Sequence, residues 1–129
     1  GELLGTVEDT LTVEVPSHDA RVVALRRPTG VPQFLGWNRQ ITMGGTVLEA
    51  SEWDESGQTL TLRFVAAAPT DKAPFTYEIA VYVPDGYGNP TVAFGGVGLV
   101  HSDADFGGGV LEVVLEPVET GTVEIAVSF

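Results

Sequence analysis

The sequence contains no cysteine, only two histidines and only six basic residues against 18 acidic ones. Without cysteine, a disulfide framework and a thiolate metal site are both excluded. The compartment stays open, because many secreted bacterial domains also lack cysteine. Extracellular and cytoplasmic locations are therefore both compatible with the sequence.

The shortage of basic residues leaves a formal net charge of −12. A surface this acidic repels phosphate, which argues against binding to DNA or RNA and against attraction to anionic membranes. No apolar run approaches the roughly 20 residues that a membrane-spanning helix needs. We therefore expect neither a nucleic-acid partner nor a membrane partner.

The sequence has instead many short apolar runs with a period of two, which is typical of half-buried β-strands. Hydrophobic residues make up 43% of the 129 residues, enough for a folded core without a disulfide or metal. Turn-forming residues separate the runs every ten to fifteen residues or so, and no helical period is convincing. We expect an all-β, mainly antiparallel β-sandwich of roughly seven to nine strands, immunoglobulin-like in general shape. The runs are "TLTVEVP", "QFLGWNRQI", "TVLEASEWD", "TLTLRFVAA", "TYEIAVYVP", "TVAFGGVGLV", "VLEVVLEPV" and "TVEIAVSF".

The segment "RRPTGVP" is the best linker candidate, because it holds two prolines and a glycine around residues 28–32. Before it, two apolar runs flank a turn at Pro16–Asp19, which predicts a hairpin within residues 1–27. This hairpin is expected to belong to a preceding β-domain or to pack on one, and the alternative is that it pairs with the sandwich of this chain. Residues 28–129 are expected to form the C-terminal β-sandwich domain.

No catalytic residues are predicted. The two histidines, His18 and His101, are distant in sequence, and no serine lies in a nucleophile elbow. Most carboxylates occupy the polar positions of alternating strands, where a solvated sheet face places its charges. The sequence favours a domain that is not itself an enzyme.

The segment "HSDADFGGG" is the best metal candidate, because Asp103 and Asp105 have the i, i+2 spacing of a calcium loop. It departs from the EF-hand pattern, with Gly107 at a ligand position and Val114 where the closing glutamate would stand. An exposed acidic turn is the favoured interpretation. We expect no cofactor, and calcium bound by Asp103 and Asp105 is the weak alternative.

Carbohydrate binding is the remaining option, because a sugar's apolar C–H face stacks on exposed aromatic rings. The candidate residues are Trp37, Trp53, Tyr82 and Tyr87, with Phe106 as a further aromatic. Packing in the core or at its edge is the favoured alternative for both tryptophans, since a sandwich of this size needs several aromatics inside.

Two stretches carry a resemblance to a known family. The first, "LTVEVPSHDARVVALR", resembles the closing hairpin of the β-sandwich that follows the catalytic barrel in bacterial α-galactosidase-like (melibiase-type) glycoside hydrolases. The second, "PQFLGWNRQITMGG", is similar to the start of an extra C-terminal β-domain in some of these enzymes. "VYVPDGY" is similar to a strand and turn of the same region.

The resemblance implies a non-catalytic accessory β-sandwich from a larger bacterial glycoside hydrolase, whose catalytic carboxylates lie on a barrel absent from this sequence. Such a domain would pack against neighbouring domains of the parent enzyme. The alternative is a carbohydrate-binding module that recognises a glycan through exposed Trp and Tyr side chains. In the first case Asn38 and Arg39 would bond backbone groups at the domain's edge.

Overall fold

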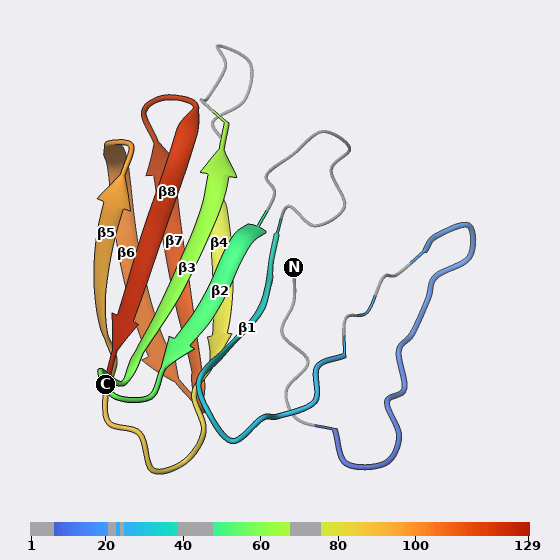
Figure 1. Ribbon diagram of the computed structural model, residues 1–129. Coiled ribbons are helices and arrows are strands. Elements are labelled where there is room, and N and C mark those ends of the chain that lie inside the picture. The colour runs from blue at the N-terminus through green and yellow to red at the C-terminus, as the bar shows by residue number, and fades with distance from the viewer. Residues whose placement is uncertain (1–6, 21–22, 24, 39–47, 68–75) are drawn as a thin grey trace.

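The structure is a computed structural model that describes residues 7–20, 23, 25–38, 48–67 and 76–129. The described residues form eight β-strands, and they contain no helix long and apolar enough to cross a membrane (Figure 1). The strands are β1 (Gln33–Trp37), β2 (Leu48–Asp54), β3 (Thr59–Ala66), β4 (Tyr77–Tyr82), β5 (Thr91–Gly96), β6 (Leu99–Gly107), β7 (Val110–Pro117) and β8 (Gly121–Ser128).

The strands form two four-stranded sheets that face each other. Within each sheet, every pair of neighbouring strands is antiparallel. Sheet A has the order β1-β4-β7-β6, and sheet B has the order β2-β3-β8-β5. The predicted antiparallel β-sandwich is confirmed, with a strand count inside the expected range. The two packed antiparallel sheets have the general shape of an immunoglobulin-like sandwich. Both sheets have four strands, whereas a constant-type immunoglobulin domain has one sheet of four strands and one of three.

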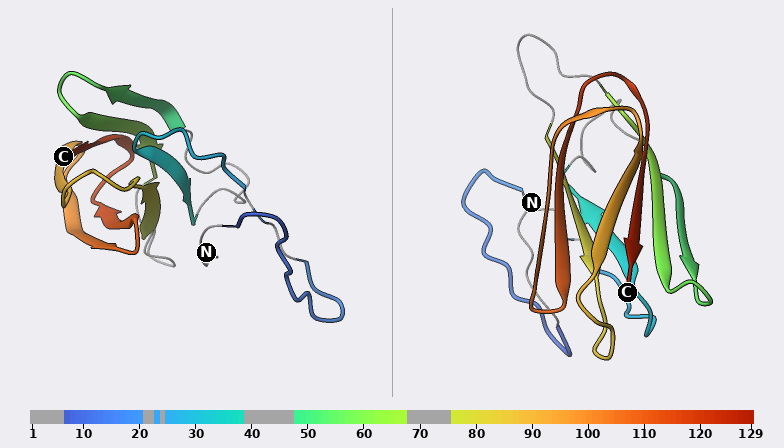
Figure 2. Two further views of the ribbon diagram at one scale, coloured as in Figure 1. Left: turned by 90° about the horizontal axis from the view of Figure 1, so that it is seen from below. Right: turned by 90° about the vertical axis from the view of Figure 1, so that its left-hand side faces the viewer.

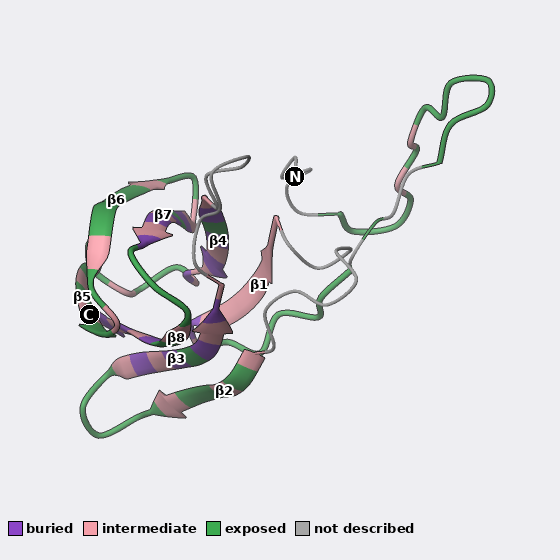
Figure 3. Ribbon diagram, turned by 90° about the horizontal axis from the view of Figure 1, so that it is seen from above, coloured by how far each residue is buried: buried purple, intermediate pink, exposed green. Residues whose placement is uncertain are grey.

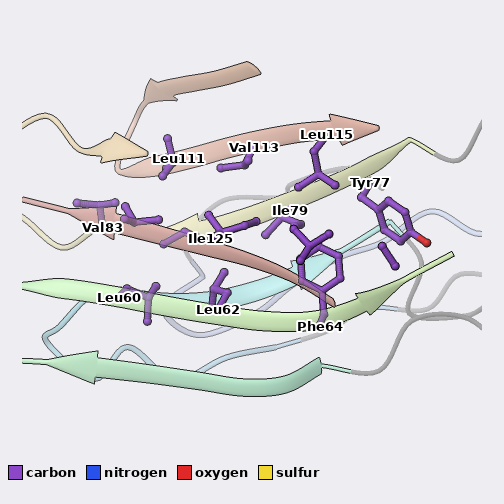
Figure 4. Close-up of a cluster of buried hydrophobic side chains, with 14 residues drawn as sticks. Leu60, Leu62, Phe64, Tyr77, Ile79, Val83, Leu111, Val113, Leu115 and Ile125 are labelled. Atoms are coloured by element: carbon purple, nitrogen blue, oxygen red, sulfur yellow. The ribbon is translucent and has the colours of Figure 1, made fainter. Parts of the chain in front are cut away.

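The core lies between the sheets and comes mainly from the four central strands. Alternate residues of β3, β4, β7 and β8 are at most 2% exposed, as the period of two in the sequence requires. Figure 4 shows Leu60, Leu62 and Phe64 of β3 facing Leu111, Val113 and Leu115 of β7 across the interior. No buried polar or charged residue interrupts this core among the described residues.

Tyr77 adds a polar anchor at the start of β4. Its side chain is 1% exposed, and its hydroxyl accepts a hydrogen bond of 2.8 Å from the backbone N–H of Ala67, just beyond β3. The phenol thus satisfies a backbone group where the chain leaves sheet B, which fixes the two sheets relative to each other.

The run "TVAFGGVGLV", expected to be a single strand, is divided between the two sheets. β5 ends at Gly96, whose φ of +90° favours glycine, and β6 begins at Leu99 in the opposite sheet. A Cβ at Gly96 would overlap the carbonyl oxygen of Thr122, so only glycine fits. The apolar content of this run is visible in the sequence. The passage of the chain from sheet B to sheet A depends on the positive φ of Gly96, which the apolar pattern does not reveal.

The described residues between 7 and 27, called the N-terminal arm below, extend away from the sandwich (Figures 1 and 2). The expected turn is present, with Asp19 N–H donating to the Pro16 carbonyl at 3.2 Å and His18 at a φ of +65°. The described residues on either side of the turn form no strand. Residues 21, 22 and 24 of the expected second strand lie outside the described part.

The expected linker folds back on the beginning of β1. The Gln33 side-chain oxygen accepts from the Thr29 backbone N–H at 2.9 Å and from the Thr29 hydroxyl at 2.8 Å. The Gln33 amide donates in turn to the Arg27 carbonyl at 3.2 Å. The segment around residues 28–32 is therefore a turn held by the first residue of the sandwich.

Candidate functional site

Trp37 lies on the inner side of sheet A. Its register partner is Ile79, which is 2% exposed, and paired residues of an antiparallel ladder share a face. Its ring packs edge-on against Phe34 at 5.5 Å and Phe64 at 5.4 Å between centroids. The Trp37 Nε1 is buried without a hydrogen-bond partner. Trp37 therefore contributes to the core margin, and little of its ring is available to a ligand.

Trp53 and Tyr87 meet at the end of the sandwich that also holds the C-terminus. Trp53, the sixth residue of β2, pairs with buried Leu60 and so faces inward. Ring centroids lie 5.6 Å apart between Trp53 and Tyr87, 5.9 Å between Trp53 and Phe129, and 5.3 Å between Tyr87 and Phe129. All three contacts are T-shaped, so the rings cover one another and close the end of the core.

Tyr82 stands apart from these aromatics. It lies between core residues Val81 and Val83 of the same chain segment, so its side chain faces the outer side of sheet A. Its register partners are Gln33 and Val110. Of the four predicted carbohydrate-binding residues, the structure brings together Trp53 and Tyr87, and the four do not share one face. Each of the four is half-buried.

The acidic segment around residues 101–107 is a strand, so the exposed turn expected there is wrong. Asp103 and Asp105 lie within β6, are exposed, and face outward beside Val114 and Glu112 of β7. The turn is confined to Gly108 and Gly109, which have φ values of +60° and +77°. In a strand the two carboxylates point the same way without the chain curling around an ion.

No group of three or more His, Asp or Glu side chains that could hold a metal occurs among the described residues. His101 lies on β6 next to this acidic pair, and His18 lies in the turn of the N-terminal arm; both are exposed.

The edge of sheet A at β1 has a polar clamp that the sequence suggested. The Asn38 amide donates to the Thr76 carbonyl at 3.1 Å and accepts from the Glu78 N–H at 3.1 Å. The Asn38 backbone N–H also donates to the Glu78 carbonyl at 3.0 Å. Asn38 therefore continues the ladder with β4 after β1 ends, as expected of a residue that bonds backbone groups. Arg39 and the glycine pair at 44–45 lie outside the described residues.

Two further polar features lie on sheet B. Arg63 donates to Glu124 at 2.8 Å on the outer face, and this hydrogen bond raises the pKa of Arg63. In the β2–β3 turn the Ser56 hydroxyl donates to Asp54 at 2.7 Å. This bond, with support from the Gly57 and Ser56 backbone N–H groups, lowers the pKa of the Asp54 carboxyl. Both features belong to exposed strand and turn positions.

The clearest unpartnered feature is the apolar side of the N-terminal arm. Val15 is 49% exposed and Leu25 is 73% exposed, and Val7 and Val23 are also exposed. In Figure 3 this part of the chain is coloured mainly as exposed, whereas buried positions alternate along β3. Sequence reasoning identified the hairpin pattern here but could not show that the described residues leave these side chains uncovered.

Two residues of these sites escaped sequence reasoning. Phe129 closes the aromatic cluster, and Gln33 holds the turn before β1. Neither has a sequence signal of its own, because both roles depend on segments that meet only in the fold. No family model, no curated protein and no solved structure matches the chain.

Proposed function

We propose that the chain is a non-catalytic accessory β-sandwich domain of a larger bacterial glycoside hydrolase, with a structural role in packing against neighbouring domains. The observation that carries the proposal is the exposed apolar side of the N-terminal arm. Period-two apolar side chains stabilise a strand only when another surface covers them. The described residues of this chain supply no such cover for Leu25 or Val15.

The turn held by Gln33 supports the same role. Because the Gln33 side chain binds both Thr29 and the Arg27 carbonyl, the arm leaves the sandwich in a defined direction. A neighbouring domain that covers the arm is then held at a defined place beside β1. The resemblance of the two N-terminal stretches to the glycoside hydrolase family supports the choice of parent enzyme.

Hydrogen exchange tests this role. In the isolated chain, amides of the arm should exchange at nearly unprotected rates. In a protein that includes the preceding domain, the same amides should exchange about tenfold or more slowly. Leu25→Glu should abolish this protection, whereas Val118→Glu, which alters a valine of the sandwich that is 50% exposed, should not. Equal exchange of the arm in the two proteins would refute the proposal.

Carbohydrate recognition through Trp53 and Tyr87 is the alternative function. A sugar needs an open ring face, and here the two rings pack edge-to-face with each other and with Phe129. Calorimetric titration with galactosides and plant polysaccharides should therefore show no binding. Binding that is lost in both Trp53→Ala and Tyr87→Ala, with the fold retained, would establish the alternative instead.

A further inference from the structure

β6 is the edge strand of sheet A that lies farthest from β1 and the N-terminal arm. It has nine residues, compared with seven in β2, six in β5 and five in β1, so it is the longest edge among the described strands. Figure 2 (right) views the molecule from this side. No described strand pairs with the free edge of β6, so another strand can be added there. The Ala104 N–H donates to the Asp103 Oδ1 at 2.9 Å, and a docked strand would replace this local bond.

The inner side of β6 is only partly covered by the sandwich. Ser102 and Ala104 pair with buried Leu115 and Val113 and therefore face inward, yet both are exposed. Phe106, on the same side, is half-buried. A strand added beside β6 would place its own alternate side chains next to these small residues and extend the core at its open margin.

The outer face of β6 is acidic, and neither Asp103 nor Asp105 forms an ion pair with a described residue. Asp103 and Asp105 stand beside Glu112 on β7, with Glu116 opposite His101, and the sequence from 99 to 117 contains no lysine or arginine. At the other acidic edge, β2, Arg63 on the neighbouring strand is paired with Glu124 and also attracts Glu52 and Glu49. No described cation has this relation to Asp103 or Asp105.

We propose that the β6 edge is a docking site for an extended segment of a partner protein, added to sheet A as a further strand. The segment would carry small apolar side chains at alternate positions, facing Ala104 and Phe106. Lysine or arginine side chains between them would face Asp103 and Asp105. Main-chain hydrogen bonds supply affinity, and the complementary charge fixes register and partner.

The same carboxylates argue against a second copy of this chain as the occupant. In a two-fold β6–β6 pairing centred on Ala104, Asp103 of one copy would lie opposite Asp105 of the other. Like charges directly opposite each other destabilise an antiparallel pair. A basic segment would be attracted by the same carboxylates. This proposal is independent of the role proposed for the N-terminal arm.

The test is an NMR titration of the whole chain with a short capped peptide of alternating valine and lysine. Amide shifts should concentrate on residues 99–107 and should weaken as salt is raised. An otherwise identical peptide with alternate backbone nitrogens methylated keeps the charge but loses main-chain donors, and it should not bind. A valine–glutamate peptide should not bind either.

The matched variants separate this site from general attraction to an acidic protein. Asp103→Asn with Asp105→Asn should weaken binding about five- to tenfold. Glu49→Gln with Glu52→Gln removes the same charge from β2 and should leave the affinity nearly unchanged. Absence of binding, shifts centred on another edge, or equal binding of the methylated peptide would overturn the proposal, as would a wild-type dimer paired through β6.

Discussion

The N-terminal arm and the sandwich share the same alternation of apolar and polar residues, but the apolar side chains are buried in the sandwich and exposed in the arm. In β3, alternation places Leu60, Leu62 and Phe64 at no more than 2% exposure. In the arm, Val15 and Leu25 occupy equivalent positions of their runs and are 49% and 73% exposed. Alternation therefore predicts which side a strand would bury, whereas a neighbouring strand decides whether the burial happens.

The largest difference between the two regions is expected from truncation of the core. Phe64→Ala removes a ring that contacts Trp37 and Tyr77, and it should lower the free energy of unfolding by about 3–5 kcal/mol. Chemical denaturation followed by tryptophan fluorescence and circular dichroism measures the change. A loss below about 1 kcal/mol would mean that this core is not packed as described.

The boundary between the regions should show an intermediate effect. Asn38→Ala removes a donor to the Thr76 carbonyl and an acceptor from the Glu78 N–H, at an expected cost of about 1–3 kcal/mol. Asn38→Asp keeps the acceptor and loses the donor, so its stability should lie between those of the wild type and the alanine variant. Hydrogen exchange should show the increase in opening at Glu78.

The exposed β2–β3 turn should contribute a smaller, pH-dependent effect. Because the folded pKa of Asp54 is lowered, its contribution is complete above the unfolded value of about 3.9 and is lost as pH falls through the folded value. The difference in melting temperature between wild type and Asp54→Asn should therefore shrink as pH is lowered from about 5 to about 2. A constant difference over this range would contradict the role of the ionised carboxylate.

The smallest effect is expected in the arm. In the isolated chain, Leu25→Ser should change the free energy of unfolding by no more than about 0.5 kcal/mol, because the side chain buries little surface. Denaturation of this variant alongside Phe64→Ala gives the comparison directly. A large destabilisation by Leu25→Ser would show that the arm packs on its own sandwich in solution.

The sequence predicted the fold class and most of the strands, because period-two alternation and turn residues are local signals. Asn38 was likewise expected to bond backbone groups at the domain's edge, and its side chain does so. The division of residues 91–107 between two sheets was not predictable, since it requires the close approach of Gly96 to Thr122. The same holds for the acidic segment, where Asp and Gly suggested a turn but pairing with β7 made a strand.

The candidate sites were less predictable than the fold. Aromatic residues identified where ligands could bind, but only the fold decides which of them share a face. Trp53 and Tyr87 meet because the β4–β5 connection and the C-terminal residue Phe129 converge on β2. The open inner side of β6 depends on how far the opposite sheet extends, which is a property of the whole sandwich.

The Gln33 side chain has a mechanical consequence. Tension on the arm would first break the hydrogen bonds of Gln33 to Thr29 and Arg27, and the backbone would then transmit it to the five-residue strand β1. β1 is held to β4 on one side, with the Asn38 clamp at its far end. A pull on the arm would therefore separate β1 from β4 first, while the central strands stay paired. The chain would lengthen by the short stretch of β1 before the force acts on the core.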